Sequence, residues 1–88
     1  MFRVWGKIIS ENHLKKEFVA EVDLPGSTRT KRVFTAMDQI TEALDLSTPI
    51  WLDVNIREFQ KRSKTRFTAD SFIEPIDFDY LEFAVIEE

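Results

Sequence analysis

Hydrophobic and polar residues alternate cleanly from Leu14 to Leu24, which is the pattern of a strand with one buried face. The segment from Phe2 to about Ser10 offers a matching apolar face, so the two predict an antiparallel hairpin with a turn at residues 12–14. Pairing Ile8 with Phe18, and Val4 with Val22, sets apolar or small residues opposite one another. The outer face of this hairpin then carries three apolar side chains: Trp5, Ile9 and Val19.

The segment from Asp77 to Glu88 also predicts a strand, because β-branched and aromatic residues dominate it. It is apolar on both sides. Phe78, Tyr80, Ala84 and Ile86 would point one way, and Leu81, Phe83 and Val85 the other. A strand of this kind needs cover on both faces. We expect it to lie beside the first strand, which gives the spatial order second–first–last.

A long amphipathic helix is predicted from about Thr28 to Asp45, because apolar residues recur there at helical spacing. The stripe consists of Val33, Ala36, Met37, Ile40 and Leu44. A shorter helix is predicted from an N-cap at Asn55 to about Arg62, anchored by Ile56 and Phe59. Residues 63–76 show no clear period.

These elements predict one α+β domain over residues 1–88. Its antiparallel sheet has three or four strands, with the long helix packed on one face. Residues 53–72 are expected to wrap an end of the sheet or to cover part of the other face.

Composition narrows the class of protein. The chain has 88 residues, of which 43% are hydrophobic, and it has no cysteine. Disulfides and thiolate metal sites are therefore excluded. No signal peptide begins at Met1, and no apolar run approaches the length of a membrane span. We therefore expect a cytoplasmic protein with no membrane partner.

Charge is distributed unevenly along the chain. The net charge is −4, yet residues 70–88 carry seven carboxylates and no cation. These carboxylates are interleaved with aromatic residues, so we expect them to pair with basic surfaces of the same fold.

Basic residues gather where the long helix should begin. Cations oppose the positive end of the helix dipole, and a bound anion would resolve this conflict. The candidate anion site comprises Ser27, Thr28, Arg29, Lys31 and Arg32. The simpler interpretation is that these cations face solvent or pair with the carboxylates near the end of the chain.

A second basic cluster spans residues 57–66 and contains Arg57, Lys61, Arg62, Lys64 and Arg66. Phe59 and Phe67 are interleaved with it, as in surfaces that stack on single-stranded bases. However, a pI near 5.0 argues against tight binding to nucleic acid.

No reaction centre is recognisable. His13, the one histidine, falls in the predicted turn, and Asp77, Asp79 and Glu82 do not have the spacing of a metal loop. We predict no catalytic residue, metal ligand or cofactor. Trp51 lies between the two helices, where it can fill the end of the core or anchor a partner.

Several phrases of the chain resemble a set of short bacterial proteins, mainly from Firmicutes, that has no assigned activity. They are Arg3–Ile9, Leu46–Asp53, Lys64–Phe67 and Asp70–Phe83, so the resemblance spans nearly the whole chain. It implies a bacterial source and carries no functional residue over.

The sequence therefore favours a non-enzymatic protein-interaction domain that forms a homodimer. Its contact surface is expected to include Trp5, Ile9, Val19 and Tyr80. The alternative is an anion or nucleic-acid binding module that uses the basic helix N-terminus and the cluster at residues 57–66.

Overall fold

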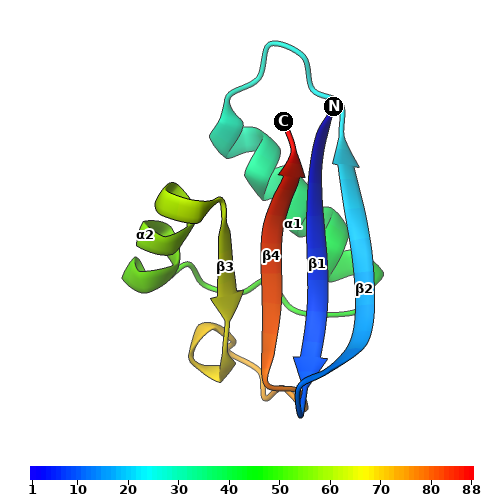
Figure 1. The fold of residues 1–88 in the computed structure, drawn as a ribbon, viewed down its shortest axis with the longest axis vertical. Helices are drawn as coiled ribbons and strands as arrows, with labels where there is room; N and C mark the ends of the chain where they lie inside the picture. Colours follow the sequence, from blue (N-terminus) through cyan, green and yellow to red (C-terminus); the bar gives the residue numbers. More distant parts are fainter.

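One four-stranded antiparallel sheet organises the chain (Figure 1). The computed structural model describes all residues from 1 to 88. The elements, in chain order, are β1 (Phe2–Ser10), β2 (His13–Val22), α1 (Arg29–Ala43), α2 (Asp53–Arg62), β3 (Lys64–Phe67), the short 3-10 helix η1 (Ala69–Ser71) and β4 (Tyr80–Glu87). The strand order is β2-β1-β4-β3. The predicted α+β class and the order second–first–last are thus confirmed, and β3 adds a fourth strand beside the last one.

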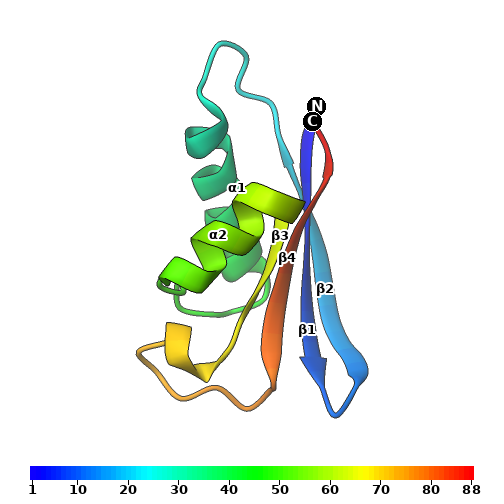
Figure 2. The same ribbon diagram turned by 60° about the vertical axis from the view of Figure 1, so that its left-hand side comes forward.

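Both helices lie on the same side of the sheet (Figure 2). Residues 53–72 were expected to wrap an end of the sheet or to cover part of its other face, and the second of these alternatives is wrong. Phe59 of α2 is buried against Phe83 of β4, with ring centroids 5.8 Å apart, so α2 covers the face that α1 also covers. The opposite face of the sheet has no layer over it.

The hairpin of β1 and β2 is shifted by two residues from the predicted register. Phe18 lies opposite Gly6 instead of Ile8, and Val4 lies opposite Ala20. The cause is the loop, which consists only of Glu11 and Asn12. Their φ angles of 53° and 64° are those of a tight two-residue hairpin turn.

A bulge near the loop then moves Leu14 to the outer face. Ile8 pairs with Lys16, whereas Ile9 pairs with Leu14, so β2 has one extra residue at this point. Leu14 was expected to share the core side of β2 with Phe18 and is instead 46% exposed. Away from the bulge, each side chain of β1 and β2 lies on the predicted face of the sheet, because a shift of two residues keeps every side chain on the same face.

Helix α1 begins and ends close to its predicted limits. The Thr28 side chain accepts a hydrogen bond from the Lys31 backbone and so forms the N-cap. All five residues of the predicted stripe are buried against the sheet: Val33, Ala36, Met37, Ile40 and Leu44.

Helix α2 begins three residues earlier than predicted, at Asp53, because its N-cap is Leu52 and not Asn55. Asn55 lies in the first turn, where its Oδ1 accepts a hydrogen bond from the Leu52 backbone at 3.0 Å. Its Nδ2 donates to Thr65 Oγ1 and to the Arg66 carbonyl, each at 2.9 Å. This buried amide joins α2 to β3, the strand that the sequence pattern did not reveal.

Candidate interaction surfaces

The uncovered face of the sheet, called here the open face, consists of four rows of side chains that run across the strands. Cross-strand pairing gives the rows as Glu21–Arg3–Glu87, Val19–Trp5–Ala84–Lys64, Glu17–Lys7–Glu82–Arg66 and Leu14–Ile9–Tyr80. Charged rows therefore alternate with mostly apolar rows. The four predicted interface residues are all on this face: Trp5 is the direct neighbour of Val19, and Ile9 is that of Tyr80.

Ion pairs join neighbouring strands within the charged rows. Arg3 Nε lies 3.0 Å from a carboxylate oxygen of Glu21 and 3.1 Å from one of Glu87. Lys7 Nζ lies 3.4 Å from a carboxylate oxygen of Glu82. The Lys7 and Glu82 side chains are only 21% and 15% exposed, because neighbouring side chains on this face shield them. The open face thus balances its own charges.

The two aromatic rings of the open face are already in contact with cations of the same chain. Lys7 Nζ lies 4.1 Å from the centroid of the Trp5 ring, and the Arg66 guanidinium lies 4.6 Å from that of Tyr80. The Trp5 indole also donates a hydrogen bond to Glu17 at 2.9 Å. These contacts fix the orientation of both rings and leave Trp5 half-buried without any second layer.

The residues of the candidate anion site at the start of α1 contact one another and nearby backbone. Thr28 caps the helix, and the Ser27 hydroxyl donates to the Leu24 carbonyl. Arg32 turns back to donate to the Ser27 carbonyl at 2.6 Å. Lys31 is exposed and forms no ion pair.

Arg29, the remaining cation of that site, binds a carboxylate from the end of β4. Its Nε lies 2.8 Å from Glu88 Oε1, and its Nη2 donates to Ser63 Oγ at 3.1 Å. The Arg29–Glu88 pair is an example of the pairing that was expected between the carboxylates near the end of the chain and basic residues of the same fold. It places a negative charge near the α1 N-terminus, where the helix dipole favours one.

The hydrogen bond from Arg29 lowers the pKa of the Glu88 carboxyl below its ordinary value of 4.5, and the charges of Arg29 and Arg32 add to this effect. A carboxyl group whose pKa is lowered in the folded state stabilises the fold at pH values above its ordinary pKa. This stabilisation is lost as the pH falls through the lowered pKa. Because both side chains are nearly half exposed, the contribution should stay below about 1 kcal/mol.

We expect an NMR titration of the Glu88 carboxyl to show this lowered pKa in the wild-type protein. In Arg29→Gln the pKa should return toward 4.5, whereas Lys31→Gln, which removes an unpaired cation of the same helix, should leave it lowered. An unchanged Glu88 pKa in Arg29→Gln would disprove the assigned pair.

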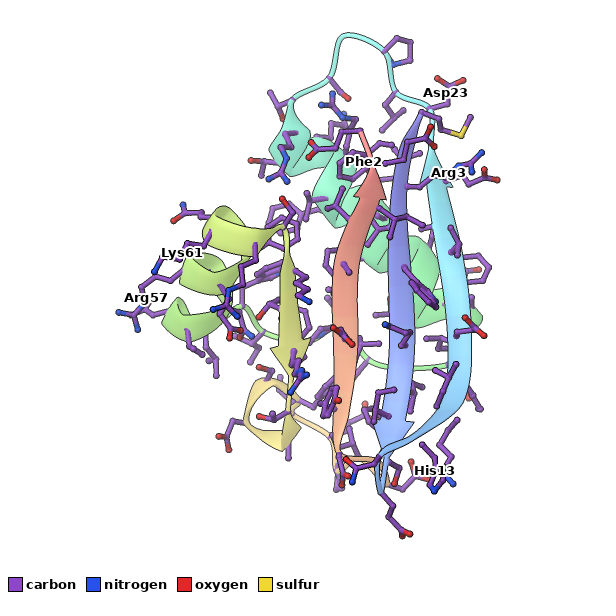
Figure 3. All side chains as sticks on the ribbon, in the orientation of Figure 1. Phe2, Arg3, His13, Asp23, Arg57 and Lys61 are labelled. Carbon is purple, nitrogen blue, oxygen red and sulfur yellow. The ribbon has the colours of Figure 1, made fainter.

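The second basic cluster does not form one surface. Arg57 and Lys61 project from α2 away from the sheet (Figure 3). Lys64 and Arg66 instead lie on the open face, at its β3 edge. Arg62 belongs with the second group, because it lines one hollow with Lys64 and Arg66. The cluster is thus divided between two sides of the domain.

An apolar groove lies between α1 and α2, with a volume of about 300 Å³. Its lining residues are Arg29, Thr30, Val33, Phe34, Trp51, Ile56, Phe59 and Gln60. Trp51 fills its floor, and its ring meets those of Phe34, Phe59, Phe67 and Phe83 edge-on at centroid distances of 4.9 to 6.4 Å. The sequence pattern did not identify this groove, although Phe34 widens the apolar stripe of α1. Phe34 is 51% exposed and Ile56, predicted as an anchor, is 41% exposed.

Other polar residues considered from the sequence have structural positions. His13 is exposed at the start of β2. Asp79 accepts a hydrogen bond from the Glu11 backbone at 2.9 Å and so ties the hairpin loop to the start of β4. No group of three or more His, Asp or Glu side chains is arranged to hold a metal ion. Neither helix is long and apolar enough to cross a membrane.

Comparisons of the chain with family models, with curated proteins and with solved structures found no match. The assignment of a function therefore depends on the geometry of the surfaces described above.

Proposed function

We propose that this chain is a non-catalytic protein-interaction domain that acts in the cytoplasm and self-associates through its open face. One observation carries the proposal: both helices cover the same side of the sheet, while Trp5, Ile9, Val19 and Tyr80 lie together on the uncovered side. Sheets with an apolar component on a free face commonly pack against a second sheet. The absence of cysteine agrees with a reducing compartment.

The charges of the open face favour a protein partner over nucleic acid. The face carries four cations, namely Arg3, Lys7, Lys64 and Arg66, and four carboxylates, namely Glu17, Glu21, Glu82 and Glu87. A phosphate backbone would meet repulsion at half of these positions, and affinity for nucleic acid depends on cations that phosphates can neutralise. A protein surface can instead present both signs in matching places.

Trp5→Glu is expected to yield a monomer, because it removes the largest apolar side chain of the open face and replaces it with a charge that would have to leave water in the contact. Light scattering at roughly 5 to 500 µM, a range that covers micromolar dissociation constants, should give a mass near that of one 10.4 kDa chain. The wild-type protein should approach twice that mass at the upper end.

Two further variants separate loss of contact from loss of folding. Val19→Lys changes an already exposed residue of the same row and should also give a folded monomer. Ile50→Lys changes a residue of similar exposure, 47% against 42%, outside the open face and should remain dimeric. If Val19→Lys dimerises as the wild type does, the open face is not the contact surface.

A further inference from the structure

We infer that the partner of the open face is a second copy of this chain, related by a two-fold axis that runs parallel to the strands between β1 and β4. The inference rests on the proposed function and specifies the geometry of the contact. It follows from the placement of charged and apolar rows, which is self-complementary under this operation.

The symmetry acts simply on the sheet. A half-turn about an axis parallel to the strands places each row of one copy opposite the same row of the other copy. It also reverses the order of the strands. The order β2-β1-β4-β3 therefore meets β3-β4-β1-β2. As a result, β1 faces the β4 strand of the other copy, and β2 faces its β3 strand. Contacts across a two-fold axis occur in pairs, so every favourable meeting is made twice.

In the charged rows, opposite charges meet across the two copies. Lys7 faces the partner's Glu82, Arg3 faces the partner's Glu87, and Glu17 faces the partner's Arg66, since these residues occupy matching rows on exchanged strands. The contact thus adds partners to pairs that already exist within each chain. This matters because charges that leave water need opposite charges beside them.

In the apolar rows, apolar side chains meet residues that can cover them. Trp5 faces the partner's Ala84, so a large side chain lies against a small one. Ile9 faces the partner's Tyr80. Val19 faces the partner's Lys64, whose aliphatic stem can cover it while the ammonium group reaches the edge of the sheet.

A two-fold axis that runs across the strands, along the Trp5 row, fails. An axis along the Trp5 row would exchange the rows on either side of it and keep the order of the strands. Arg3 would then face the partner's Lys7, and Glu21 would face the partner's Glu17. Because like charges would meet in both places, the charges of the open face favour the axis parallel to the strands over this one.

One pair of residues tests this geometry through the recovery of contact on mixing. The single variants alone would not suffice, because Glu17 also accepts the Trp5 hydrogen bond and Arg66 contacts the Tyr80 ring within each chain. Glu17 lies on β2 and Arg66 on β3, at opposite edges of the sheet. Three strand spacings separate them within a chain, which is about 14 Å. They can therefore meet only between copies, and both are exposed residues whose substitution leaves the core intact.

The test uses charge reversal followed by mixing. Glu17→Arg sets Arg against the partner's Arg66, and Arg66→Glu sets Glu against the partner's Glu17. Each variant alone should raise the dissociation constant of the dimer at least about tenfold. An equimolar mixture should recover dimers, because a mixed pair brings opposite charges together at both positions.

The outcomes separate the geometry from the function. Recovery of dimers on mixing, with differently tagged variants that co-purify, supports the two-fold contact. If the wild type dimerises but the mixture stays as weak as the separate variants, the proposed axis is wrong while self-association stands. If the wild type itself remains a monomer over the same concentrations, the proposed function fails and the inference fails with it.

Discussion

Replacing Met37 with Asp is expected to abolish cooperative unfolding of the domain. Met37 is 1% exposed in the layer between α1 and the sheet, where no cation is placed to pair with a carboxylate. Burying an unpaired charge costs several kcal/mol. Small domains are stable by only about 5–15 kcal/mol, so this change removes a large part of the total. Circular dichroism during urea unfolding should show a broad or absent transition.

Val54→Asp is the matched control, since it also introduces Asp for an apolar residue of a helix. Val54 is 49% exposed in the first turn of α2, where the helix dipole favours a negative charge. Its unfolding midpoint should stay close to that of the wild type. If Met37→Asp unfolds as sharply as Val54→Asp, then α1 does not pack on the sheet as described.

The second large effect is expected at Gly6 of β1, which packs directly against Ile40 of α1. A Cβ atom at this position would lie 2.6 Å from Ile40 Cγ2, which is too close for any real contact. Ile40 is fully buried and branched at its Cβ, so this methyl group has little room to move. Gly6→Ala should therefore cost about 1–3 kcal/mol of unfolding free energy.

A double-mutant cycle tests the cause of this loss. Ile40→Ala alone should cost about 2–5 kcal/mol, because it leaves a cavity under the sheet. In the double variant the new methyl group at residue 6 occupies part of that cavity, so the total cost should be smaller than the sum of the two single losses. Additive losses in urea unfolding would show that the clash with Ile40 is not the cause.

The periodicity of the sequence was sufficient to predict the long helix and the order of three strands. The stripe from Val33 to Leu44 contains enough turns to define its buried face, and all its members are buried. The periodicity could not, however, determine the register of the hairpin of β1 and β2. The alternation of polar and apolar residues repeats every two positions, so a shift of two keeps every apolar side chain on its face. The two-residue loop at Glu11 and Asn12 and the one-residue bulge beside it together set the observed register.

Strand β3 was missed because four residues are too few to show a period. Its position depends on Asn55, whose side chain reaches forward to Thr65 and Arg66. Asn55 resembled a helix N-cap in the sequence, because a cap residue with a Glu three residues later, here Glu58, is typical of a helix start. A tertiary hydrogen bond of this kind leaves no periodic signal in the sequence.

The candidate surface was predictable in part. The alternation in β1 and β2 placed Trp5, Ile9 and Val19 on one face without knowledge of the register. The rows themselves depend on the register, because only the observed pairing brings Arg3 beside Glu21 and Lys7 beside Glu17. The contact between Arg29 and Glu88 likewise depends on the packing of α1 against the end of β4, which the sequence pattern does not describe.

The mass of the wild-type protein in solution tests the central claim, that the open face is a self-association surface, most directly. Light scattering should be measured from roughly 5 to 500 µM, which spans the range where micromolar contacts form. We expect the mass to rise from near 10.4 kDa toward twice that value as concentration increases. A mass that stays at 10.4 kDa over the whole range would contradict the account.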